Sequence, residues 1–407
     1  MRMTQRARPN ARCQVSFSDG LPRNSVPKGH QGRQRALEAV ALWGTRASYL
    51  GPVRACAVWL SAYVWVGTFA GCVGPGYMAN KSAAMLAVAE PAVASHWDAE
   101  LVAQALPGQI LQLEGLLRAS PENLDLTLGL ARAYLGYAYG VVEEELEQRA
   151  LQSRVASGGA GGLDALAEAT DPSGADLPSV GELSYLPGTR AQVLRDRASR
   201  IYERVRVLGG NALEQVRPGY IEAKEQGPAA LERYSAALGD GDHDAALLLA
   251  TGLGWGAWIQ MQDQAPAAVA ELPLARVLVL RAVELAPELD GAAGLIFLGS
   301  VAAALPKAAG GDAEHARVLF ERALELTDGE ALGVHLAYAR EVAVRHEDKA
   351  LFSRLIGAAR ASGVPPGSGG ARFRLANAFH APRLRRLTQT HCEWLGAKGC
   401  APHTEGS

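Results

Sequence analysis

Two stretches of this 407-residue chain carry the same helical pattern, 41 residues apart. Residues 278–285 read LVLRAVEL, and residues 319–326 read LFERALEL. In both stretches apolar residues recur every three or four positions, with charged residues between them. This is the pattern of an amphipathic helix that buries one side against a neighbour. A repeated helix of this kind constrains the fold strongly, because each copy needs a partner to cover its apolar stripe.

The positions where a neighbouring helix must approach closely hold similar residues in both copies: Ala275, Val279 and Ala282, then Ala316, Phe320 and Ala323. This spacing resembles the second helix of a tetratricopeptide repeat. The second copy departs from the pattern, because Asp328 stands where the first copy has Pro287. The offset also exceeds the usual repeat of about 34 residues, which predicts longer loops. The alternative is two unrelated amphipathic helices in an ordinary α protein.

Composition supports a helical fold along most of the chain. Ala and Leu are abundant, aromatic residues make up 6% of the sequence, and alternation typical of strands is nearly absent. A chain of this length accommodates two average domains or one solenoid. We therefore expect an all-α protein that forms a tetratricopeptide-like helical-repeat superhelix.

The net charge of −2 hides an uneven distribution along the chain. Residues 1–71 contain ten basic and two acidic residues, which leaves 30 basic and 40 acidic residues in 72–407. An acidic body repels the phosphate backbone, so we expect no nucleic-acid partner.

The N-terminal region has the composition of a leader rather than of a folded domain. Residues 1–52 are rich in Arg, Gly, Pro and Gln without a sustained period, so we expect them to be disordered. Arg54 and the uncharged run Ala55–Gly71 follow, and we assign residues 53–71 to a lipoprotein signal peptide. Because fifty residues ahead of a signal are unusual, we expect translation to begin near Val53.

The last three residues of the signal peptide and the cysteine that follows read FAGC, at residues 69–72. This sequence resembles a bacterial lipobox. In a lipobox the cysteine, here Cys72, becomes the lipid-modified first residue of the mature chain. Phe69 departs from the pattern, since an aliphatic residue is usual there. The alternative is an uncleaved signal anchor, although 17 residues lie at the lower limit for spanning a bilayer. We expect a periplasmic protein anchored by lipid to a bacterial membrane, with the outer membrane favoured.

The mature chain divides into three parts by pattern. Residues 72–95 are expected to form a tether, residues 96–387 a helical-repeat domain, and residues 388–407 a C-terminal tail. Within the domain, Pro107 is expected to interrupt a helix. Residues 153–187 are rich in Gly, Ala, Ser, Asp and Pro and predict a loop.

Several stretches of the domain resemble the TatT component family, the repeat-containing lipoproteins associated with TRAP transporters. They are residues 106–145 (beginning LPGQILQLEGLLRASPENLDL), 250–261 (ATGLGWGAWIQM), 274–326 (beginning LARVLVLRAVELAPELD) and 374–387 (RLANAFHAPRLRRL). The resemblance implies a periplasmic accessory that binds the solute-binding protein of a TRAP transporter. It also implies a helical array around a pore, a small organic ligand, and a homotrimer.

The sequence shows no arrangement of residues that predicts catalysis. It has no phosphate-binding loop, no HExxH and no GxSxG, and Glu143–Glu145 predict a solvated helix face. We therefore expect no enzyme, no cofactor and no resident metal. In the tail, Cys392 and Cys400 are expected to form a disulfide. Free thiols, or a zinc site completed by His391 and His403, are the alternatives.

Trp255 and Trp258 lie three residues apart in a segment that also contains Gly252, Gly254 and Gly256. Because glycine is costly in a helix, by about 1 kcal/mol relative to alanine, its repetition predicts close backbone approach or open space. One interpretation is tight packing with both rings in the core. The other follows from the family resemblance and makes the rings line a pore, with the remaining candidate residues being Tyr134, Tyr137 and Asn377.

Three functions of different classes remain open at this point. The first is a lipid-anchored periplasmic accessory of a TRAP-type transporter. The second is a structural lipoprotein scaffold for envelope assembly that binds no ligand. The third is a hydrolase or metal protein that uses the histidines and cysteines of the tail.

Overall fold

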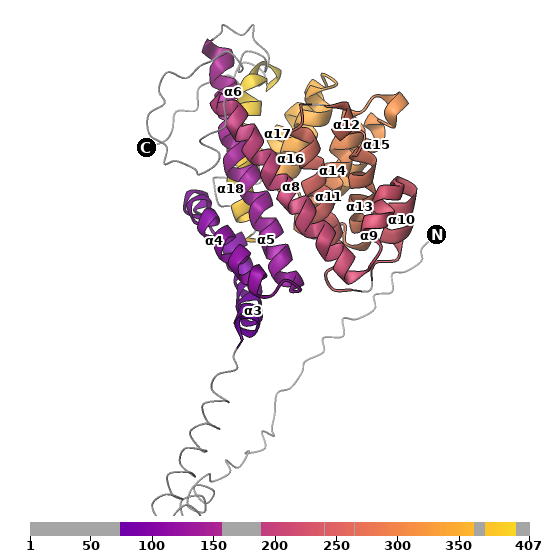
Figure 1. Ribbon diagram of the computed structural model, residues 1–407. Coiled ribbons are helices and arrows are strands. Elements are labelled where there is room, and N and C mark those ends of the chain that lie inside the picture. The colour runs from indigo at the N-terminus through magenta and orange to yellow at the C-terminus, as the bar shows by residue number, and fades with distance from the viewer. Residues whose placement is uncertain (1–73, 157–188, 240, 264, 362–370, 396–407) are drawn as a thin grey trace, which may run out of the picture. The chain divides into compact units, whose positions relative to one another are not determined.

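The computed structural model describes residues 74–156, 189–239, 241–263, 265–361 and 371–395. All of them belong to one compact unit, residues 74–407. In these ranges every regular element is a helix (Figure 1), which confirms the prediction of an all-α helical-repeat fold. No helix of the described part is long and apolar enough to cross a membrane. The expected leader with Cys72, and the tail beyond residue 395, lie outside the described residues.

The elements ahead of residue 157 are α3 (Pro75–Ala94), α4 (Ala99–Ala119), α5 (Leu124–Tyr137), the π-helix η2 (Ala138–Glu143) and α6 (Glu144–Ala156). Between residues 189 and 263 they are α8 (Arg190–Val216), α9 (Tyr220–Gln226), α10 (Pro228–Ala236) and α11 (Asp244–Gln260). From residue 265 to 361 they are α12 (Pro266–Val269), α13 (Leu272–Leu285), α14 (Leu289–Ala304), η4 (Lys307–Ala309), α15 (Ala313–Leu326), α16 (Leu332–Tyr338), the π-helix η5 (Ala339–Val344) and α17 (Lys349–Ala361). The last elements are η6 (Ala371–Phe373), α18 (Arg374–Thr390) and η7 (Cys392–Leu395).

Polar side chains fix where several of these helices begin. The side chain of Asp98 accepts a hydrogen bond from the Leu101 amide at the start of α4. The side chain of Asn123 accepts a hydrogen bond from the Leu126 amide at the start of α5. Thr189 forms a capping box with Gln192 at the start of α8. Each cap satisfies amide donors that the first helical turn leaves unpaired, and contributes about 1 kcal/mol.

The repeated helices are confirmed in register. Helices α13 and α15 begin and end at positions that differ by 41 residues, as the sequence repeat predicts. The shared positions are fully buried in both helices: Ala275, Val279 and Ala282, then Ala316, Phe320 and Ala323. Helix α14 packs between them, against α13 on one side and α15 on the other. Gly310 at φ +86° and Gly329 at φ +67° provide left-handed turns in the connections around α15.

The long helix α8 connects two parts of the core. In Figure 1 it runs beside α5 and then beside α11, with which it makes one of the most extensive contacts in the fold. One cluster of buried side chains lies among α3, α4, α5, η2 and α8, and a second among α5 and α8 to α14. A third lies among α14 to α17.

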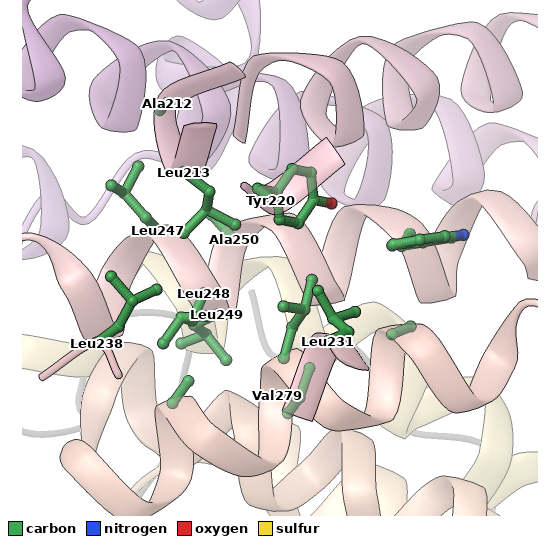
Figure 2. Close-up of a cluster of buried hydrophobic side chains, with 14 of the residues drawn as sticks. Ala212, Leu213, Tyr220, Leu231, Leu238, Leu247, Leu248, Leu249, Ala250 and Val279 are labelled. Atoms are coloured by element: carbon green, nitrogen blue, oxygen red, sulfur yellow. The ribbon is translucent and has the colours of Figure 1, made fainter. Parts of the chain in front are cut away.

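The second cluster shows how the middle of the chain is held together. Figure 2 shows Leu213 of α8, Leu231 of α10, Leu248 of α11 and Val279 of α13 converging, and each is fully buried. Tyr220 of α9 closes the cluster and is 3% exposed. All three clusters consist of residues from 74–407, so this unit carries its own hydrophobic core.

The tether expected over residues 72–95 is replaced by a helix from residue 75 onward. Helix α3 packs on α4 and α5 and buries Ala79 and Ala83. The hydroxyl of Ser120 and the amide of Asn123 both donate to Asn80 Oδ1, at 2.7 and 2.8 Å. The small side chains of Ala79 and Ala83 let α3 approach its neighbours closely.

Two further boundaries differ from the sequence prediction. Helix α4 continues through Pro107, since Leu106, Ile110 and Leu113 are buried on one side and hold the helix together across the missing hydrogen bond. The tail expected from residue 388 is ordered through Leu395, where the Trp394 ring packs edge-on against Phe352 at 5.4 Å.

Candidate functional site

The three glycines of α11 are explained by close contacts with three different helices. A β-carbon at Gly252 would lie 2.5 Å from Val279 of α13. At Gly254 it would lie 2.6 Å from Val205 of α8, and at Gly256 it would lie 2.3 Å from Phe297 of α14. Helix α11 is therefore packed tightly on three sides, which supports the packing interpretation of these glycines.

The two tryptophans of α11 differ in their surroundings. Trp255 is 2% exposed, and its indole N–H donates to Glu271 Oε2 at 2.7 Å. The guanidinium of Arg206 lies 5.3 Å from the Trp255 ring centre and 4.4 Å from that of Trp258. Arg206 also pairs with Glu271 at 2.8 Å. One arginine thus connects both rings with a carboxylate, while Trp258 stays half-buried.

Tyr134 and Tyr137 lie on α5. The Tyr134 hydroxyl donates to Glu114 Oε1 at 3.0 Å, and Tyr137, 8% exposed, accepts from Arg197 at 2.6 Å. Burial alone would raise the pKa of Glu114, but hydrogen bonds from Arg204 and Tyr134 lower that pKa below its ordinary value. Tyr134 and Trp258 each pack against both the first and the second cluster, whereas Tyr137 belongs to the first and Trp255 to the second.

Asn377 lies apart from these aromatic residues. It is 1% exposed on α18, accepts from the Leu332 amide and donates to the Glu330 carbonyl, both at 2.8 Å. These bonds cap the start of α16, so the amide of Asn377 already has structural partners.

A polar cluster that sequence reasoning missed lies around α18. The π-helix η2 contributes Tyr139 and Glu143, and α18 contributes His380 and Arg383. The Tyr139 hydroxyl and His380 Nδ1 share a hydrogen bond of 2.8 Å. The Arg383 guanidinium lies 3.9 Å from the Tyr139 ring centre and donates to the Tyr139 carbonyl at 2.7 Å. Within the described residues, Arg383 Nη1 is buried without a hydrogen-bond partner.

The acidic run Glu143–Glu145 belongs to this cluster and is not the solvated face that we expected. Glu143 accepts from the Tyr202 hydroxyl. Glu144 binds Arg386 through both carboxylate oxygens, and Glu145 binds Arg190 at 3.0 and 3.1 Å. The sequence alone predicts a solvated face for three consecutive glutamates because it does not show which basic or hydroxyl groups bind them. Tyr202, Arg386 and Arg190 lie more than 40 residues away in the sequence from the glutamates they bind, so local pattern could not reveal these three partners.

The surroundings favour the neutral forms of His380 and Tyr139 at the centre of the cluster. Burial, with Arg383 and Arg340 close by, lowers the pKa of His380 to about 3. Burial raises the pKa of Tyr139 to about 12 and also raises the pKa of Glu143. Arg340 comes from the second π-helix, η5, and keeps 48% of its side chain accessible. Two π-helices thus contribute residues around one polar cluster. Because π-helical segments are frequent at functional sites, this cluster is a candidate functional site.

Two grooves of about 550 Å³ each lie elsewhere in the described part. The first lies between α4, α5 and α8 and is lined by polar residues that include Glu114, Arg118, Arg204 and Gln215. The second lies between α10, α13, α14 and α15 and is more apolar. Neither contains the four aromatic candidates, although Tyr134 is hydrogen-bonded to Glu114 in the wall of the first.

The expected tail site is only partly within the described residues. Cys392 is disulfide-bonded, while Cys400, its expected partner, and His403 lie outside the described residues. Among the described residues there is no group of three His, Cys, Asp or Glu side chains placed to hold a metal ion.

The fold and these sites define a class of protein: an all-α helical-repeat protein with tightly packed helix pairs and a buried polar cluster that joins distant parts of the chain. A family model for the TRAP transporter T-component matches residues 95–158 and 187–390, more than half of the chain. The chain therefore belongs to the TRAP transporter T-component family. No curated protein matches it significantly.

The matched ranges agree with the domain structure. They leave out residues 159–186, which fall within the segment expected to be a loop, and they include all of α4 to α6 and α8 to α18. The accessory role in a TRAP transporter, expected from resemblance alone, is thus confirmed at the level of the family. The four aromatic candidates and the polar cluster all lie within the matched residues.

Proposed function

We propose that this protein is a lipid-anchored periplasmic accessory of a TRAP-type transporter that binds the solute-binding subunit. The observation that carries the proposal is the family match over nearly the whole helical unit. The acidic charge of residues 72–407 supports a protein partner rather than nucleic acid. The uncharged run ending at Gly71, followed directly by Cys72, supports the lipid anchor and the export.

The same proposal includes a small organic ligand held between α5, α8 and α11. Tyr134 and Trp258 are the best-supported contacts, since both are partly buried and connect two core clusters. Arg206, 4.4 Å from the Trp258 ring centre, provides a nearby cation. Trp255, Tyr137 and Asn377 have the burial and the hydrogen bonds of supporting residues. A homotrimer, implied by the family resemblance, belongs to this proposal as well.

The test is a pull-down with the mature protein, residues 72–407, and a solute-binding protein encoded near its gene. We expect specific capture of the solute-binding protein. Mass spectrometry of the mature N-terminus is expected to show an acylated Cys72. Failure to capture any such partner with a correctly folded, lipidated protein would contradict the proposal.

A second candidate function is a structural scaffold for envelope assembly that binds no ligand. The tight packing of α11 against α8, α13 and α14 favours it, since each glycine contact leaves no space at that point. Native mass spectrometry separates the two functions. A co-purified small molecule supports the ligand-binding accessory, and its consistent absence supports the scaffold.

A further inference from the structure

Helix α3 presents an apolar face that no described part of the chain covers. Tyr77, Met78, Met85 and Val88 are 56, 58, 74 and 82% exposed. At about 100° per residue these side chains fall on one side of the helix, within about a third of its circumference. The opposite side holds Ala79 and Ala83, which are buried against the fold. The exposed face thus runs along about three turns of a helix whose other side is already packed.

The position of α3 in the chain indicates what this face meets. The helix begins at Pro75, directly after the uncharged run 55–71 and Cys72. The membrane attachment is either an acylated Cys72 or an uncleaved anchor that ends near Cys72. In both cases the attachment ends within three residues of Pro75, the first residue of α3. Three residues extend at most about 10 Å, so the first turn of α3 starts at the level of the lipid headgroups.

Lys81 distinguishes a lipid surface from a second copy of the chain. This exposed lysine lies in the middle of the apolar face, four residues from both Tyr77 and Met85, with Nζ 5.6 Å from the Tyr77 ring centre. Lysine is depleted from the cores of protein interfaces. At a membrane surface its alkyl stem lies among apolar groups while the ammonium reaches the phosphates.

The remaining charges of α3 agree with this orientation. Glu90, the acidic residue of the helix, lies on another side and pairs with Arg132 of α5 at 3.0 Å. Of the charged residues of α3, the exposed face therefore holds the lysine and not the glutamate. Anionic phospholipids attract such a surface.

We propose that the Tyr77–Val88 face of α3 lies in the headgroup region of a phospholipid bilayer, as a second attachment beside the N-terminal anchor. Asn80 fixes α3 to the α4–α5 turn through its two hydrogen bonds. Because α3 is fixed in this way, its contact with lipid sets the orientation of the whole helical unit. The inference takes its cellular setting from the proposed membrane attachment, but it can be tested without it.

The experiment uses unlipidated residues 74–407, which carry a complete hydrophobic core. We expect this protein to co-sediment with vesicles of phosphatidylethanolamine and phosphatidylglycerol. Met85→Glu places a carboxylate in the face and is expected to weaken vesicle binding about tenfold. Lys81→Gln is expected to weaken binding to these vesicles while leaving binding to phosphatidylcholine vesicles unchanged.

Leu280→Glu is the matched control, because Leu280 is a 48% exposed apolar residue on α13. It is expected to bind vesicles like the unsubstituted protein, and circular dichroism is expected to show equal melting for all variants. Absence of vesicle binding by residues 74–407 would overturn the inference, as would an equal loss in Leu280→Glu. An oligomer that Met85→Glu dissociates, without vesicle binding, would assign the face to a second copy instead. None of these outcomes depends on the solute-binding partner, so the proposed function stands or falls separately.

Discussion

At the scale of single residues, His380 is held neutral by its surroundings. Its folded-state pKa of about 3 lies below the ordinary value of about 6.5. As pH falls below about 6.5 the unfolded chain binds a proton at this site and the folded chain does not, so stability is lost. Acidification from about pH 7.5 to about pH 4.5 is expected to cost about 2–3 kcal/mol through this residue alone.

His380→Gln keeps a polar side chain beside Tyr139 and removes the titration. We expect the free energy of unfolding of this variant to fall less on acidification than that of the unsubstituted protein, by about the same 2–3 kcal/mol. Urea unfolding at a series of pH values measures the difference. His315, which is at the start of α15 and shows no contact with this cluster, provides the control substitution His315→Gln. Identical pH dependence in His380→Gln and the unsubstituted protein would contradict this account.

Trp255 and Trp258 are expected to respond differently to truncation. Trp255→Ala removes a ring that is 2% exposed, together with its hydrogen bond to Glu271, and is expected to cost about 3–5 kcal/mol of folding stability. Trp258→Ala removes a half-buried ring and is expected to cost less stability but to reduce retention of a co-purified ligand. Denaturation curves and native mass spectrometry measure the two effects. Equal losses of stability in both variants would place Trp258 in the core and remove the support for its ligand role.

At the scale of helices and their connections, the loop ahead of α15 depends on one glycine. A β-carbon at Gly311 would lie 1.7 Å from the Leu305 carbonyl oxygen, and backbone cannot move away cheaply. Gly311→Ala is therefore expected to destabilise the protein by about 2 kcal/mol. Gly357→Ala is the control, because Gly357 is exposed within α17 and has open space around it. That substitution is expected to stabilise by up to about 1 kcal/mol, and the thermal midpoints of the two variants should move in opposite directions.

The helices that could be predicted are those whose pattern is local. Helices α13 and α15 follow from a repeated apolar stripe, and their 41-residue register is confirmed. The π-helices η2 and η5 could not be predicted, because a single added residue in a helical turn leaves no signature in apolar spacing.

The candidate site was predictable only where its residues lie in one segment. The glycines around Trp255 and Trp258 predicted close packing or open space in that segment. In the structure these glycines lie at close packing contacts with neighbouring helices. Tyr139 and His380, by contrast, lie 241 residues apart in the sequence. Each residue alone looks ordinary, and only the folded chain places them within hydrogen-bonding distance.

At the scale of the whole helical unit, α18 connects the last part of the described residues to the first. It packs on α16 and on α3 and α4, and its arginines pair with Glu144 and Glu147 of α6. Gly140 of η2 permits this approach, since a β-carbon there would lie 2.8 Å from the Phe379 ring. The unit is therefore held by contacts between distant segments as well as by stacked neighbours, which distinguishes it from an open solenoid.

The central claim is that this unit serves a TRAP transporter by binding its solute-binding subunit, and native mass spectrometry of the two proteins mixed together tests it most directly. We expect a complex of defined stoichiometry that forms with residues 72–407 and is reduced in variants that unfold the unit, such as Trp255→Ala. The contradicting result is a folded, lipidated protein that stays free at every concentration of the solute-binding subunit encoded near its gene.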